Sequence, residues 1–158
     1  LEAGEKVLIF SSFVEPLLEI QDKFYSESVM ITGKTPVQDR GFLVNQFQTD
    51  PNIRVFLGGI KSAGVGITLT AASNVIFLDY SWNPADHQQA QDRAHRPGQV
   101  ANSVNIYQLT AIDTIDEDLK ETLDKKQGIF DQVIEGKKAV KKEKNAMDSA
   151  VQRVLDNY

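Results

Sequence analysis

Cysteine is absent from the 158 residues of this sequence. Its absence excludes a disulfide framework and a cysteine-ligated zinc site, and it is compatible with a reducing cytosol. No apolar run approaches the roughly 20 residues needed to cross a bilayer, and there is no signal-peptide pattern. The first residue is Leu1 rather than Met, so we expect a piece of a longer protein.

Positive charge is also scarce. Seventeen Lys and Arg stand against 22 Asp and Glu, a formal net charge of −5. The sequence therefore lacks the global basic field of a self-sufficient DNA-binding domain, although a local basic patch remains compatible with it. The end of the chain differs, since residues 136–158 hold six basic and three acidic residues, a local net charge of +3. Such a run is usually a solvated helix face or a disordered end, with phosphate contact as the alternative.

Five short apolar runs predict β-strands, and segments of helical spacing separate them. The first run is apolar at every position, as in a strand buried on both faces of a parallel sheet, whereas the fifth alternates. Strands that alternate with helices predict an α/β fold with helices on both faces of the sheet. The runs are Val7–Phe10, Val29–Ile31, Val55–Leu57, Val75–Asp79 and Val104–Leu109.

The predicted helices end at turn-forming residues. Asp50-Pro51 stops the second helix and Pro97-Gly98 stops the helix before the fifth strand. Ligands of such sheets bind at the carboxyl ends of the strands, so we expect the loops after the strands to carry the chemistry. The predicted helices cover 17–24, 36–49, a short segment after the glycines 58, 59, 64 and 66, 85–95, and a segment capped by Thr114 or Asp116 that runs to Val133.

Two nucleotide-binding patterns are incomplete. Gly33-Lys34-Thr35 is similar to the end of a Walker A loop, but that motif needs an earlier glycine where Ser28 stands. Gly64-x-Gly66 opens like a dinucleotide fingerprint, but Leu69 stands in place of its third glycine. Neither stretch is therefore predicted to hold phosphates by itself.

The two histidines do not predict a metal site. His87 and His95 lie eight residues apart, with Asp86 and Asp92 near them. Two surface or structural histidines are the favoured interpretation, because no further ligand pattern accompanies them. No bound metal is predicted for this chain.

The most informative stretch runs from Gln89 to Gln99. Arg93 and Arg96 are three residues apart, so they are predicted to share one face near the end of a helix. The planar arginine fork suits phosphate oxygens, and such a pair can stabilise charge on a transferring γ-phosphate. Asp92 and Gln89 could orient the arginines or bind nucleotide. On these residues alone, a surface Asp–Arg network is the alternative.

The order of motifs along the chain resembles the C-terminal motor lobe of Swi/Snf family ATPases, within helicase superfamily two. The resemblance covers residues 5–136, and the ordered set is specific. The matching segments are Lys6–Ser11 (motif IV), Thr32-Gly33 with Arg40 (motif IVa), Gly64–Ala72 (motif V), Trp82-Asn83-Pro84, and Gln89-x-x-Asp92-Arg93-x-x-Arg96 with Gly98-Gln99 (motif VI).

The resemblance implies a RecA-like fold and a division of labour between two lobes. An N-terminal lobe of the same polypeptide, absent from this chain, would hold ATP with Mg²⁺ through its Walker motifs. This lobe would supply Arg93 and Arg96 as catalytic groups, with Gly66, Gln89 and Asp92 near the nucleotide. At Gly66 the missing side chain permits close backbone approach, although a tight turn is the alternative. The isolated chain is expected to be inactive.

Motifs IV, IVa and V imply contacts to the phosphate backbone of double-stranded DNA, which carry no sequence information. We expect the DNA affinity of the lone lobe to be weak and strongly salt-dependent. Two residues depart from the family pattern: Ile60 replaces a common threonine, and Pro97 replaces the more usual isoleucine. The candidate DNA contacts are Ser11, Ser12, Thr32, Gly33, Lys61 and Ser62.

We therefore expect a motor lobe over residues 1–136 and a charged, helical or partly disordered extension over 137–158. The implied whole is an intracellular, DNA-associated translocase of the chromatin-remodeler kind, of which this fragment would be monomeric. A strand-separating or annealing helicase, or a non-catalytic binding module, are the alternatives. Trp82-Asn83-Pro84 and Gly98-Gln99 favour the translocase, whereas Ala63-Gly64-x-Gly66-Ile67-Thr68 resembles the strand-annealing branch of the family.

Overall fold

The computed structural model describes residues 5–63, 66–81, 83–99, 101, 103–120, 122 and 125. The chain divides after Leu109 into two compact units. The first unit holds the sheet and is described first, and the second unit, which begins at Thr110, follows separately.

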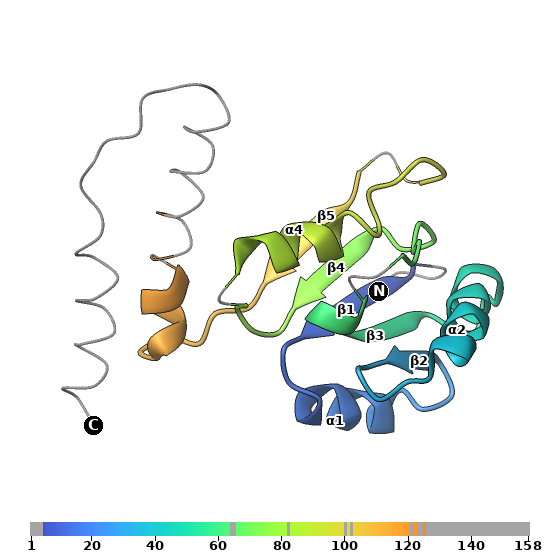
Figure 1. Ribbon diagram of the computed structural model, residues 1–158, viewed down its shortest axis with the longest axis horizontal. Coiled ribbons are helices and arrows are strands. Elements are labelled where there is room, and N and C mark those ends of the chain that lie inside the picture. The colour runs from blue at the N-terminus through green and yellow to red at the C-terminus, as the bar shows by residue number, and fades with distance from the viewer. Residues whose placement is uncertain are drawn as a thin grey trace. The chain divides into compact units, whose positions relative to one another are not determined.

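The first unit contains a five-stranded sheet in the order β2-β3-β1-β4-β5, with every neighbouring pair parallel (Figure 1). Val7 of the central strand lies opposite Val55 on one side and Asn74 on the other. All five predicted strands are present, with bounds that differ by at most two residues from those predicted. The strands are β1 (Val7–Ser11), β2 (Ser28–Ile31), β3 (Val55–Gly59), β4 (Asn74–Phe77) and β5 (Asn105–Gln108).

Helices cover both faces of the sheet, as predicted. Successive residues of β1 point to opposite faces, so Leu8 and Phe10 enter one core while Val7 and Ile9 enter the other. Burial on both faces explains why this strand is apolar at every position. The first core also takes buried residues from α2 (Val37–Thr49), α3 (Ile60–Ala63) and α4 (Pro84–Gln91), and the second takes Leu17 from α1 (Glu15–Lys23).

Lys6, just before β1, closes the end of α2. Its ammonium donates to the carbonyl oxygens of Phe47 and of Asp50 (2.7 Å) and lies 5.1 Å from the centre of the Phe47 ring. These carbonyls have no partner within the helix, and a cation suits the negative end of its dipole. Burial lowers the pKa of Lys6, and Asp50 opposes that shift. Lys6 therefore stabilises the fold.

The helix before β5 ends earlier than predicted. α4 stops at Gln91 rather than His95, and the chain continues in turns. The N–H of Arg93 donates to the carbonyl of Ala90, three residues back (3.2 Å), whereas an α-helical N–H donates to the carbonyl four residues back. Arg93 and Arg96 therefore do not share an α-helical face, and that prediction was wrong.

Two further predictions need correction. The short helix α3 lies inside the glycine-rich stretch rather than after it. β5 is an edge strand, and two successive residues within it, Ile106 and Tyr107, are both about half exposed. The alternation in its sequence therefore does not separate a buried face from an exposed one.

In the second unit, Thr114 rather than Asp116 caps the helical turns at 115–120. Its hydroxyl accepts a hydrogen bond from the N–H of Asp116 (3.2 Å). The end of this helix predicted at Val133, the domain boundary at 136 and the extension over 137–158 lie outside the described residues. None of the helices that the structure describes is long and apolar enough to span a membrane.

Candidate functional site

The loops that follow β1, β2, β3 and β4 meet at one edge of the sheet, because parallel strands all end there. They enclose a pocket of about 380 Å³, which we call the carboxyl rim. Five of the six predicted DNA contacts line it. The lining residues are Ser12, Phe13, Val14, Thr32, Gly33, Gly59, Ile60, Lys61, Ser62, Tyr80, Ser81, Asn83 and Asp86.

Ser11, the sixth predicted contact, points inward and is fully buried. Its hydroxyl donates to the Asp79 carboxylate and accepts from the N–H of Phe13 (3.0 Å). The same carboxylate accepts from the N–H of Ser12 through both oxygens, at 2.9 and 3.1 Å. Asp79 therefore holds the loop after β1, a role that the sequence alone did not indicate.

Arg40 joins two loops of the carboxyl rim. Its Nε donates to the carbonyl of Thr35 (3.2 Å) and its Nη2 to that of Thr32 (3.4 Å), both in the loop after β2. Its Nη1 donates to the carbonyl of Ser62, beyond β3, at 3.5 Å. One guanidinium thus links motif IVa to α3, the helix just before motif V.

Gly33 and Ile60 line the carboxyl rim, and their surroundings show whether the fold itself requires these residue types. A Cβ added to Gly33 would meet nothing within 4 Å, so the fold itself does not require glycine there. The Ile60 side chain is 1% exposed and packs in the first core. Ile60, which stands where the family usually has threonine, therefore anchors α3 in the core and has no hydroxyl to offer to a phosphate.

A capping network forms the wall of the rim beside α4. Asn83 caps this helix, because its side-chain oxygen accepts from the N–H of Ala85 (3.2 Å). Asp86 accepts from the Ser81 hydroxyl (2.9 Å) and from the Asn83 amide (3.0 Å). The neighbouring Trp82 lies outside the described residues.

His87 is a hydrogen-bond acceptor in this wall. Its Nε2 accepts from the N–H of Ser81 at 2.7 Å, which requires the neutral imidazole, and its ring packs 4.5 Å from that of Phe77. Burial lowers the pKa of His87, while Asp79 and Asp86 act in the opposite direction. Among the described residues, no three His, Asp or Glu side chains gather as they would around a metal ion.

The turns over residues 92–99, which we call the arginine loop, contact motif V. Arg96 Nη1 donates to the Thr68 hydroxyl (3.2 Å), and the N–H of Leu69 donates to the carbonyl of Arg93 (2.9 Å). Arg96 is half-buried, whereas the side chain of Arg93 is buried, with 5% of the residue exposed. Burial lowers the pKa of Arg93, the charge of Arg96 lowers it further and Asp92 opposes both. The Arg93 guanidinium remains charged at neutral pH.

The other predicted nucleotide contacts lie on the surface. Gly66, Gln89 and Asp92 are exposed, and Asp92 accepts from the side chain of Gln88 (2.9 Å). Gly66 has φ +69°, and a Cβ there would meet nothing within 4 Å. This left-handed backbone conformation favours glycine at this position.

Arg96-Pro97-Gly98-Gln99 forms a turn in which the N–H of Gln99 donates to the carbonyl of Arg96 (3.0 Å). Proline in second place and Gly98 with φ +103° in third place are typical of a type II turn. Pro97 thus sets the geometry of this turn and leaves the arginine charges unchanged. Gln99 then donates to the carbonyls of Ala72 (2.8 Å) and Ala94 (3.1 Å).

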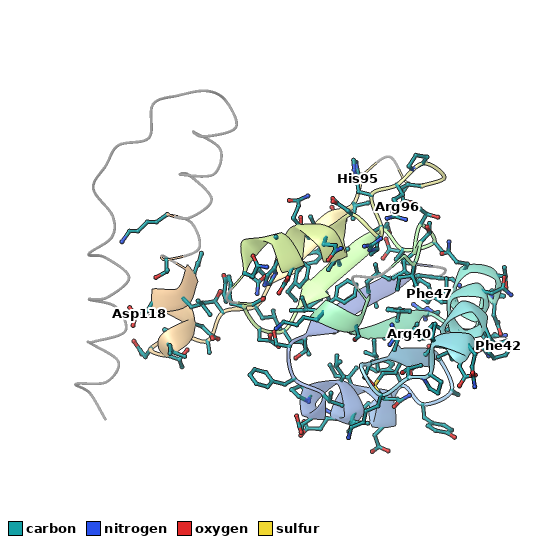
Figure 2. The ribbon with its side chains drawn as sticks, in the orientation of Figure 1. Arg40, Phe42, Phe47, His95, Arg96 and Asp118 are labelled. Carbon is teal, nitrogen blue, oxygen red and sulfur yellow. The ribbon has the colours of Figure 1, made fainter. Side chains whose placement is uncertain are left out.

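The arginine loop precedes β5, and the motif V residues it contacts precede β4. The predicted DNA contacts therefore lie at the ends of strands, where chemistry was expected, whereas the two arginines do not. Figure 2 shows Arg96 and His95 together beyond α4, well apart from Arg40. The two candidate surfaces are distinct.

Comparison with known proteins shows which family the chain belongs to. The helicase conserved C-terminal domain family matches residues 1–98. ATP-dependent helicase fft1 of Schizosaccharomyces pombe is 43% identical over 120 residues, which are 74% of this chain and 13% of that protein. Chromatin-remodeling ATPase INO80 of Saccharomyces cerevisiae is 36% identical over 138 residues, 85% of this chain and 9% of that protein.

A solved structure has the same fold. The C-terminal part of the Fun30 ATPase domain aligns with a TM-score of 0.69 at 41% identity, covering 74% of this chain and 38% of that one. This chain therefore spans only a small part of the curated relatives it matches.

Proposed function

Because this chain belongs to the helicase conserved C-terminal domain family and is the C-terminal lobe of a Swi/Snf-type ATPase motor, we propose that it serves an ATP-driven, double-stranded-DNA translocase of the chromatin-remodeler kind. Its partner is the N-terminal lobe of the same polypeptide, which holds ATP and Mg²⁺. The lobe alone is inactive. The whole protein acts inside the cell, on DNA.

One observation carries this proposal. The chain segment that brings Lys61 and Ser62 to the carboxyl rim continues into Thr68 and Leu69, which bond to the arginine loop. A single short segment therefore belongs to both candidate surfaces. Such an arrangement supports a motor in which DNA contact and ATP hydrolysis affect each other.

On the ATP side, Arg96 is the better placed of the two arginines, since it is half-buried while Arg93 is buried. ATP supplies the phosphoryl group, and an arginine fork stabilises the charge that develops on it during transfer. Arg93 contributes from inside the lobe or after the lobes close on each other. Gly66, Gln89 and Asp92 are exposed and available to the nucleotide.

On the DNA side, the carboxyl rim offers donors suited to phosphate oxygens. Ser12 and the buried Thr32 carry hydroxyls, Gly33 lets a phosphate approach the backbone, and Lys61 supplies a positive charge. The Ser62 hydroxyl donates to the carbonyl of Gly59 (3.0 Å) and would have to leave this partner to donate to a phosphate. Ser11 supports these contacts from below. Because the contacts are to phosphates, binding weakens steeply with salt.

The test is Arg96→Ala in the protein that carries both lobes. DNA-stimulated ATP turnover should fall by about a thousandfold or more, as for other arginine fingers, while the Kd for ATP stays nearly unchanged. Arg54→Ala is the matched control, because Arg54 precedes β3 and pairs with Glu27 (3.9 Å) away from both surfaces. Near-normal turnover in Arg96→Ala would contradict the assignment.

A further inference from the structure

A carboxylate lies beneath the surface proposed to bind phosphate. Asp79 follows β4, is half-buried and bonds to Ser11 and Ser12 in the loop that enters the carboxyl rim. A negative charge here repels phosphate, so electrostatics alone make this residue unfavourable for DNA binding. Its hydrogen bonds suggest what compensates for the repulsion.

We propose that Asp79 is a positioning residue that holds the loop after β1 in its phosphate-binding shape. The inference rests on the proposed function of the carboxyl rim. Three consecutive residues depend on this one carboxylate: Ser11 and Ser12 donate to it directly, and Phe13 donates to the Ser11 hydroxyl that it orients. Hydrogen bonds to an ionised acceptor are about twice as strong as neutral ones, so the carboxylate orders the loop more firmly than a neutral side chain would.

The backbone around Asp79 is itself anchored on both sides. The N–H of Leu78 donates to the carbonyl of Phe10 in β1 (2.9 Å), and the side chain of Gln108 in β5 donates to the carbonyl of Asp79 (3.2 Å). The carboxylate is therefore attached to strands of the sheet. It can fix the loop relative to the strands rather than move with it.

Positioning and simple electrostatics make opposite predictions for Asp79→Asn. Loss of the negative charge alone should strengthen DNA binding. Loss of an acceptor that serves Ser11 and Ser12 together should weaken it, because an asparagine offers one oxygen and places an amide donor against these two donors. The sign of the change decides between the two.

The experiment uses the protein with both lobes. We expect Asp79→Asn to raise the DNA concentration that gives half-maximal ATPase stimulation about tenfold, the scale of one hydrogen bond to a charged group. The KM for ATP without DNA, and the turnover at saturating DNA, should stay within about twofold, because the arginine loop is untouched. Asp39→Asn, an equal charge change at an exposed position in the first turn of α2, should not weaken DNA binding.

A second variant protects the test from misfolding. Ser11→Ala should raise the same DNA concentration about threefold, and the double variant should be no weaker than Asp79→Asn, since the two residues act through one interaction. Should Asp79→Asn fail to fold, as judged by circular dichroism, Ser11→Ala alone decides. Equal or tighter DNA binding by Asp79→Asn, unchanged binding by Ser11→Ala, or full additivity would each overturn the proposal. If the unaltered protein showed no DNA-stimulated turnover, the proposed function would fail instead.

Discussion

Replacing Arg40 tests how the carboxyl rim is built. Arg40→Met keeps the apolar stem and removes the guanidinium that joins the carbonyls of Thr32, Thr35 and Ser62. The three bonds are 3.2 to 3.5 Å long, so each falls at the weak end of the usual range, about 0.5 kcal/mol. Their loss should lower the free energy of unfolding by about 1.5 kcal/mol and the Tm by about 3–6 °C.

The larger effect should be on DNA. With the fork gone, the loops after β2 and β3 are no longer joined, and the protein with both lobes should need several-fold more DNA for half-maximal ATPase stimulation. Arg40→Lys should rescue only part of this, because a single ammonium cannot reproduce a planar fork. Arg54→Met is the control for losing an arginine elsewhere. A normal DNA requirement in Arg40→Met, whatever its Tm, would refute the role assigned to this residue.

Two further predictions concern single residues. Gly33→Ala should leave the Tm within about 1 °C, since the added Cβ meets no atom within 4 Å. It should weaken DNA binding, because a phosphate is proposed to approach the backbone at this glycine. Unchanged binding in a DNA titration would contradict this close phosphate contact. His87 has a folded pKa below its unfolded value, so the stability it contributes is present above about pH 6.5 and is lost as pH falls. The Tm should therefore drop between pH 7.5 and 5.5, and His87→Gln should flatten that slope while His95→Gln, at an exposed position, should not.

The sequence predicted the sheet well because the burial of a strand determines which residue types it contains, and this pattern is visible within a few consecutive residues. Val7 to Phe10 are all buried, and an unbroken apolar run is the direct result. The family resemblance was also confirmed by the comparisons. The end of α4 was missed for a physical reason. Ala90 and Ala94 are both fully buried and four residues apart, so they keep helical spacing, although the N–H groups of Arg93 and Ala94 bond to the carbonyls three residues back rather than four.

The interior of the candidate site could not be read from the sequence. Ser11 and Ser12 are adjacent, and nothing in their types indicates which of them turns inward. Asp79, 68 residues away from Ser11, decides it. The contact of Arg40 with Ser62 likewise spans 22 residues. Contacts between distant segments depend on the folded sheet, which local patterns do not describe. The roles of Arg93 and Arg96 in hydrolysis stay predictions.

The attachment of motif V to its surroundings has an evolutionary consequence. Gln48 of α2 donates to the Thr70 hydroxyl (3.2 Å) and accepts from the N–H of Ala71 (2.9 Å), while Gln99 holds the carbonyl of Ala72. Each glutamine is thus matched to a partner far away in the chain. A substitution at Thr70 that removes the hydroxyl leaves a half-buried amide without its acceptor. Among relatives, positions 48 and 70 should therefore change together. The residues next to either position in the sequence would not indicate this pairing.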